Sequence, residues 1–164
     1  MKVSSAQRIT INIIKWALFA VVMVVVLVML TKSTGAANPA DIKALQANVT
    51  QAADTEKMKE GDNRMLRRLY GIDPELLDGM VLYYPASNMG AEELLFVRVK
   101  DPANAAAVKS LIEQRNASQI QAFEGYGVEQ TQMLKEAVIQ EYGQDIIYAV
   151  GEDNKDCIKA YEGT

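Results

Sequence analysis

Histidine is absent from the 164-residue chain, and cysteine occurs once, at Cys157. Histidine is the commonest general base and a frequent metal ligand, so its absence excludes Ser-His-Asp and Cys-His catalytic arrangements and histidine-containing metal sites. A lone cysteine cannot form an internal disulfide, and Cys157 has no histidine to activate it. We therefore expect Cys157 to be a small buried apolar side chain rather than a nucleophile.

Carboxylates are the next candidates for chemistry. Glu152, Asn154 and Asp156 alternate as in a calcium-binding loop, but Cys157 replaces the expected glycine and the bidentate glutamate that ends such loops is missing. We interpret this segment instead as the start of a helix with Asp153 as its N-cap.

Glu92 and Glu93 are neighbours in a predicted strand, so their side chains point to opposite faces. We expect a solvent-exposed pair at the strand edge, and either carboxylate would need a partner if it were buried. The sequence predicts no catalytic residue, no metal site and no cofactor.

Arginine and aromatic side chains offer binding rather than catalysis. Arg64, Arg67 and Arg68 form a basic patch on a short predicted helix, which is either a solvated face or a contact for anionic lipid headgroups or wall polymers. Phe123 and Tyr126 flank a glycine and are interpreted either as a plug of the core or as part of a ligand pocket.

Charge divides the chain into an apolar, cationic head and an acidic body. Residues 1–31 contain no Asp or Glu, and their cations are Lys2, Arg8 and Lys15. The run from Trp16 to Leu30 is almost entirely apolar, and with residues 9–15 added it is long enough to span a bilayer. We predict a transmembrane helix over residues 9–31. The acidic body lacks the basic stripe that nucleic-acid-binding proteins carry, so we expect no nucleic-acid partner.

The flanks of this segment predict its orientation. Cations precede the apolar run, so the positive-inside rule places residues 1–8 in the cytoplasm as a tail. Lys15, Trp16 and Lys32 are the predicted residues at the membrane interface. Residues 32–41 form a stalk, and residues 42–164 form an extracytoplasmic domain, so the predicted location is the cell membrane with a single pass. The alternative is a cleaved secretory signal, for which the small residues at 33–35 or at 35–37 offer a cleavage site.

Hydrophobic spacing and turn residues predict the elements of the body. An amphipathic helix begins near Asp41, and a short helix starts at the N-cap Asp62 and ends at Gly71. Further helices are predicted at 102–124, 129–137 and 153–161, and strands at 80–84, 95–100, 138–142 and 146–150. A two-residue Gly143-Gln144 turn joins the last two strands. The expected fold is α+β: a four-stranded, mainly antiparallel sheet with helices packed on one face.

The strand at 95–100 supplies the predicted binding surface. Leu95, Val97 and Val99 are expected to meet the helices, so alternation turns Phe96, Arg98 and Lys100 toward the uncovered face. An aromatic residue beside two cations is typical of a docking surface. The predicted binding residues are Phe96, Arg98, Lys100 and Tyr126.

Four segments occur in an order that resembles a known family: residues 69–74, the strand at 93–101, residues 123–130 and the Gly143 hairpin. Over residues 40–162 the chain is similar to an extracytoplasmic domain of unknown function from Gram-positive anaerobic bacteria. The resemblance implies a location and a fold and supplies no catalytic residues. Many relatives carry a lipoprotein signal and a proline where Val128 stands, and the chain departs from both patterns.

Three classes of function are compatible with these observations. The favoured one is a membrane-anchored module of the cell envelope that binds another protein or itself, and it is not an enzyme. The alternative is a domain that binds a small ligand in a pocket with converging polar groups, or a wall polymer. The least favoured is a hydrolase that uses carboxylates alone, which needs two acids on one cleft. Expected partners are the bilayer, through residues 9–31, and an envelope protein or a second copy.

Overall fold

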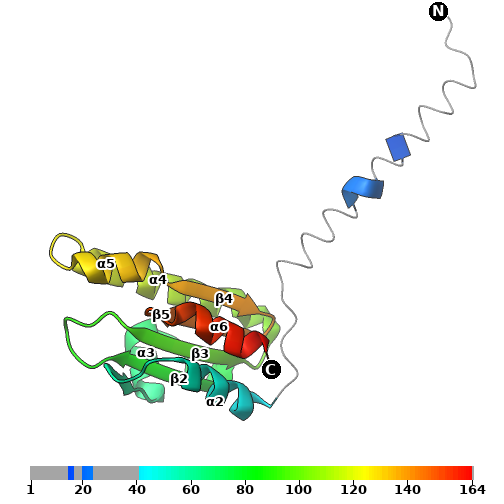
Figure 1. Cartoon of the computed structure of the whole chain (residues 1–164). Coiled ribbons are helices and arrows are strands. Elements are labelled where there is room, and N and C mark those ends of the chain that lie inside the picture. The colour runs from blue at the N-terminus through cyan, green and yellow to red at the C-terminus, as the bar shows by residue number, and fades with distance from the viewer. Residues whose placement is uncertain (1–14, 17–19, 24–40, 164) are drawn as a thin grey trace, which may run out of the picture. The chain divides into compact units, whose positions relative to one another are not determined.

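The computed structural model describes residues 15–16, 20–23 and 41–163 (Figure 1). The chain divides into two units, Met1–Gly35 and Ala36–Thr164, of which the second contains the folded domain. The described residues of the first unit are helical and exposed. The helices of the second unit are α2 (Ile42–Ala52), α3 (Asn63–Tyr70), α4 (Ala105–Phe123), α5 (Val128–Lys135) and α6 (Asn154–Glu162), with short 3-10 turns η1 (Pro74–Leu76) and η2 (Pro102–Asn104).

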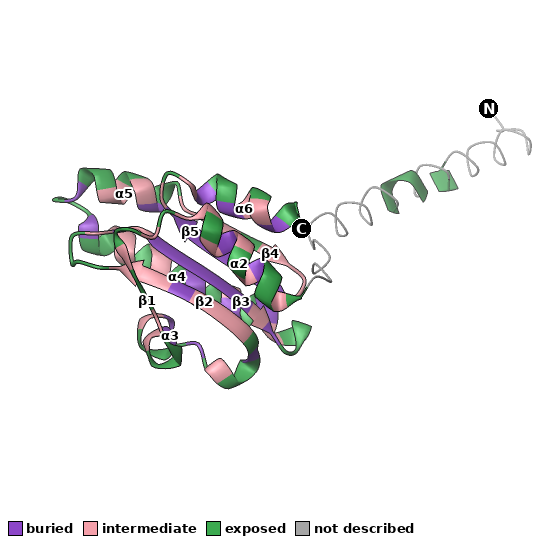
Figure 2. Cartoon of the chain, turned by 60° about the horizontal axis from the view of Figure 1, so that its bottom comes forward, coloured by how far each residue is buried: buried purple, intermediate pink, exposed green. Residues whose placement is uncertain are grey.

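One antiparallel sheet forms the middle layer of the domain, and its strand order is β1-β2-β3-β5-β4. The strands are β1 (Met58–Glu60), β2 (Leu77–Pro85), β3 (Glu93–Val99), β4 (Val138–Tyr142) and β5 (Asp145–Val150). Leu95 of β3 lies opposite Leu82 of β2 on one side and Tyr148 of β5 on the other. The residues of β3 and β5 are almost all buried, whereas most residues of β2 are only partly buried (Figure 2).

Helices cover both faces of the sheet. Helices α2 and α6 lie on one face, and α3 and α4 lie on the other (Figure 1). The two cores use alternate residues of β3, because successive side chains in a strand point in opposite directions. Leu95, Val97 and Val99 join the core beneath α3 and α4, while Leu94 and Phe96 join the core beneath α2 and α6.

Two features of the predicted fold are corrected by this arrangement. The sheet has five strands rather than four, because residues 58–60 pair with the end of β2 as an edge strand. Helices pack on both faces rather than one. The face that carries Phe96, predicted to be uncovered, lies beneath α2 and α6 because the apolar stripe of α2 needs a surface to cover.

The predicted membrane helix is also corrected. No helix among the described residues is long and apolar enough to cross a membrane. Most of residues 9–31, the tail at 1–8 and nearly all of the stalk at 32–41 lie outside the described ranges.

Local signals at the ends of α3 are confirmed. The Asp62 carboxylate accepts a hydrogen bond from the backbone N–H of Met65 at 2.8 Å, which caps the helix. Gly71 follows the helix with φ of 70°, a left-handed conformation that glycine adopts without a steric penalty.

The turn between β4 and β5 is confirmed as well. Gly143 has φ of 62°, and Gln144 is not among the residues with positive φ, as a type II′ turn requires. At α6 the prediction is right only in part. Asp153 occupies the N-cap position, but its carboxylate accepts the backbone N–H of Asp54 instead of capping the helix.

Candidate functional site

The four predicted binding residues do not form one surface. Phe96 is completely buried against Tyr161 of α6, with ring centroids 6.2 Å apart. Arg98 is largely covered. Lys100 is exposed beyond the end of β3, and its Nζ donates to the carbonyl oxygen of Glu75 at 2.9 Å. Tyr126 is exposed on the loop between α4 and α5, so Phe96 and Arg98 cannot dock a partner together with it.

The predicted membrane-interface residues lie in the other unit. Lys15 and Trp16 are helical and exposed. Lys32 lies outside the described residues.

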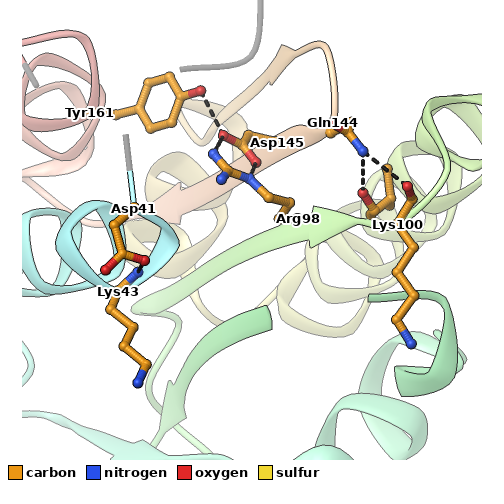
Figure 3. A network of polar contacts seen from close by, with 8 residues as sticks. Asp41, Lys43, Arg98, Lys100, Gln144, Asp145 and Tyr161 are labelled. Carbon is orange, nitrogen blue, oxygen red and sulfur yellow. Dashed lines mark hydrogen bonds and ion pairs between the residues drawn. The ribbon is translucent and has the colours of Figure 1, made fainter. Parts of the chain in front are cut away.

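Arg98 belongs to a buried ion pair that fixes the packing of α6 on the sheet (Figure 3). Its Nε and Nη2 donate to the two carboxylate oxygens of Asp145 at 2.5 and 2.6 Å. The hydroxyl of Tyr161 donates to the same carboxylate at 2.8 Å. The hydrogen bond to Asp145 raises the pKa of the Arg98 guanidinium, so Arg98 stays charged. With both oxygens taken by close donors, we assign this cluster to the fold rather than to a ligand.

A second buried cluster lies on the opposite face and is held more loosely. Glu93 has no exposed surface, and the Tyr70 hydroxyl donates to its Oε1 at 2.5 Å. Arg115 of α4 donates to the same carboxylate from Nη2 at 3.2 Å and from Nε at 3.4 Å, and its guanidinium lies 5.9 Å from the centre of the Tyr70 ring. Tyr148 lies edge-on to Tyr70 and donates to Asn116 at 3.2 Å.

Burial dominates the electrostatics of this cluster. Loss of water raises the pKa of the Glu93 carboxyl, and the Arg115 charge and the Tyr70 hydrogen bond offset only part of that rise. The pKa of the Tyr70 hydroxyl is raised for the same reason, with the Glu93 charge as the second cause. The prediction of Glu92 and Glu93 as a solvated pair is therefore wrong for Glu93. The expectation that a buried carboxylate would be paired is confirmed.

Arg115 also lines a cavity of about 310 Å³ between α3, α4 and two loops. Its lining includes Arg68 from α3, Tyr84 from the end of β2, Phe123 from the end of α4 and Tyr126 from the loop after α4. The rings of Phe123 and Tyr126 are 5.7 Å apart. Amides and a hydroxyl complete the polar part of the wall, from Ser87, Asn88 and Gln119. In Figure 1 the β2–β3 loop and the α4–α5 loop lie at the same end of the domain.

The cavity brings together two of the features that the sequence singled out, because Arg68 of the basic patch and Tyr126 share it. Arg64 does not line it, and Arg67 is engaged elsewhere, in an ion pair with Asp73 at 2.7 Å. Arg68 takes part in none of the ion pairs of the described residues. Arg115 and Tyr84 were not predicted as site residues from the sequence. Glu93 carried a usable signal, since it shares the buried face with Leu95, Val97 and Val99.

Among the residues that the structure describes, the cavity is lined by neither a thiol nor a metal-binding cluster. Cys157 is buried on the other face of the sheet, and burial raises the pKa of its thiol to about 12, so it is inert as a nucleophile. Within the ranges that the structure describes, no group of three His, Cys, Asp or Glu side chains could hold a metal ion. The chemistry that the cavity offers is therefore cationic and aromatic recognition.

Comparison with known proteins identifies a family and no individual relative. Neither curated proteins nor solved structures gave a significant match to the chain. A family model described as "Domain of unknown function (DUF4358)" matches residues 51–151, which include the whole sheet and the cavity. The predicted resemblance to a family of unknown function is confirmed at that level. Since the match covers more than half of the sequence, the chain belongs to the DUF4358 family of domains of unknown function.

Proposed function

We propose that the domain is a non-catalytic binding module that takes an anionic ligand with a flat, apolar part into the cavity between Arg68, Arg115 and Tyr126. The observation that carries this proposal is the convergence of two arginines and three aromatic rings on one cavity. The preference for an anion follows from the arginines, and the preference for a flat apolar part follows from the rings.

The long hydrogen bonds between Arg115 and Glu93 support an anionic ligand. Arg98 donates to Asp145 at 2.5 and 2.6 Å, whereas the bonds from Arg115 to Glu93 are 3.2 and 3.4 Å long. A guanidinium has five N–H donors, so the remaining donors of Arg115 are available to a group in the cavity. Because Arg115 is only 15% exposed, a bond between it and a ligand is formed in a medium of low dielectric constant, where it is strong.

The size and lining of the cavity support a small ligand or the end of a chain. Ligand pockets occupy about 300–1,000 Å³, and a cavity of about 310 Å³ is at the small end of that range. A single aromatic ring with one carboxylate or phosphate group suits such a space. Tyr126, which is 61% exposed, is placed to cover the flat part of the ligand.

Binding of phenyl phosphate to the full chain tests the proposal, with benzylamine as the cationic analogue. Titration calorimetry should detect phenyl phosphate and not benzylamine. The Arg68→Gln variant should bind phenyl phosphate about tenfold more weakly, because a charge-assisted hydrogen bond to phosphate is lost. Arg64→Gln is the matched control, since Arg64 is exposed on the same helix and does not line the cavity.

Two results would contradict this function. Equal affinity for phenyl phosphate and benzylamine would show that the cavity does not select anions. Equal losses in the Arg68→Gln and Arg64→Gln variants would show that the general positive charge of α3 acts, rather than the cavity.

The proposal includes a position outside the cytoplasm, in the cell envelope. It is supported by the charge pattern of residues 1–31, which carry cations and no acids, followed by an acidic body. Protease added to intact cells should then degrade the domain. Degradation only after the cells are opened would contradict the proposed location.

A further inference from the structure

We propose that the exposed edge of β2 is a docking site for an extended basic peptide from a partner protein, which adds to the sheet as a further strand. This site is separate from the cavity of Arg68 and Arg115, and the two proposals can fail independently.

The edge is open because β1 is shorter than its neighbour. β1 pairs only with Tyr83–Pro85 at the end of β2, whereas β3 pairs with β2 from Leu77 to Tyr83. Along residues 77–81, β2 therefore has a partner strand on one side only among the described residues. At about 3.3 Å per residue this edge is about 16 Å long, which matches a peptide of five residues.

Backbone groups of β2 point out from this edge. The carbonyl oxygen of Leu82 accepts a hydrogen bond from the N–H of Gly61, just beyond β1, at 2.8 Å. In an antiparallel ladder the N–H and C=O groups of every second residue point to the same side. The N–H and C=O of Met80 therefore face the same edge, past the end of β1, where an added strand would pair with them.

Two hollows run along this edge and give side chains of a peptide a place to lie. Their volumes are about 540 and 770 Å³, and both are lined by Gln46, Glu60, Gly61 and Met80, so they are continuous. Helix α2 borders both hollows on one face of the sheet, and the start of α3 borders the larger hollow on the other face. A strand seated here would alternate its side chains between these two helices.

The charges around the edge select the partner. Its charged lining residues are Glu60, Asp62, Asp78 and Arg64, so acidic groups exceed basic ones. A basic peptide complements them. A second copy of this chain, paired through the same edge, would place Glu60 and Asp78 of both copies near each other, and like charges across strands are destabilising.

Binding of the peptide acetyl-Lys-Val-Lys-Val-Lys-amide to the full chain tests this inference. The acidic peptide acetyl-Glu-Val-Glu-Val-Glu-amide, of the same length, is the control. Hydrogen exchange followed by NMR should show slower exchange of the Met80 amide when the basic peptide is present, and no change with the acidic one. The double variant Glu60→Lys with Asp78→Lys should bind the basic peptide about tenfold more weakly, since two surface charge pairs are reversed.

The matched control is Glu124→Lys with Glu129→Lys, which reverses two exposed acids beyond the β2 edge and should leave the affinity unchanged. Equal binding of the two peptides, or unchanged exchange of the Met80 amide at saturation with the basic peptide, would overturn the inference. Both results come from the unmodified chain, so they do not depend on the folding of a variant. Slower exchange of Met80 as protein concentration rises, without peptide, would overturn the partner assignment in favour of self-association.

Discussion

Replacing Arg115 by methionine should destabilise the domain, because among the described residues Arg115 is the one cation bonded to the buried Glu93. Glu93 is fully buried, and after the change the Tyr70 hydroxyl is its remaining side-chain partner. Breaking a buried ion pair by removing one partner costs about 3–5 kcal/mol. The Arg115 bonds are long and the side chain is partly exposed, so we expect the low end, about 3 kcal/mol, near pH 7. That is a large share of the ~5–15 kcal/mol by which native domains are stable.

The loss should depend on pH in a defined direction. Burial raises the pKa of the Glu93 carboxyl in the folded state above its unfolded-state value of about 4.3. The free energy of unfolding therefore falls as pH rises through the interval between these two pKa values. Arg115 lowers the pKa of Glu93, and without it the interval widens. The deficit of the Arg115→Met variant should therefore shrink to about 1 kcal/mol near pH 4, where the Glu93 carboxyl is mostly protonated even in the unfolded state.

Urea unfolding followed by far-UV circular dichroism, at pH 4 and pH 7, measures both effects. The double variant Glu93→Leu with Arg115→Met should recover most of the stability at pH 7, because no buried charge is left without a partner. A deficit that is the same at both pH values would show that the ionisation of Glu93 does not cause the loss of stability. So would a double variant that is less stable than Arg115→Met alone, since Glu93 would then be stabilising without Arg115.

Phe96→Ala should lower the free energy of unfolding, measured in urea, by about 4 kcal/mol, because the ring is fully buried between β3 and α6. The control Lys100→Ala, at an exposed position, should change it by less than about 0.5 kcal/mol. Similar losses in the two variants would contradict the placement of Phe96 in the core. Gly71→Ala should cost about 1 kcal/mol through its positive φ alone, since an added Cβ meets no atom within 4 Å, and an unchanged urea midpoint would oppose that conformation. Cys157 should react with a maleimide only after the domain is unfolded, and rapid labelling of the native chain would contradict its burial.

Local signals were the most predictable part of the fold. The end of α3 at Gly71, its cap at Asp62 and the Gly143-Gln144 turn each depend on a few adjacent residues, so the chain specifies them locally. The strand at 58–60 could not be found in this way. Its residues are Met-Lys-Glu, which lack β-branched and aromatic side chains, and the segment is a strand only because the distant end of β2 pairs with it.

The sequence of β3 could have predicted that helices cover both faces of the sheet. Residues 94–97 read Leu-Leu-Phe-Val, an unbroken apolar run, which is typical of a strand buried on both faces rather than one. Strict alternation was therefore the wrong interpretation of this segment. Because of this interpretation Phe96 was predicted to be exposed, whereas it lies in the core beneath α2 and α6.

The cavity could be predicted only in pieces. Arg68 and Tyr126 drew attention as a cation on a short helix and an aromatic residue beside a glycine. Arg115, in contrast, is one cation among the polar residues of a long helix. Its role depends on Glu93, which lies on β3 and is distant in sequence, so the pairing follows from the packing of α4 on the sheet.

NMR of the arginine side-chain Nε–H groups, during a titration of the full chain with phenyl phosphate, tests whether Arg68 and Arg115 bind an anion together. The signals of Arg68 and Arg115 should shift and saturate with the same dissociation constant, while the signal of Arg98, which is bonded to Asp145, should not move. Shifts of Arg98 with no change at Arg115, or no saturable shift at Arg68 and Arg115, would contradict this joint binding.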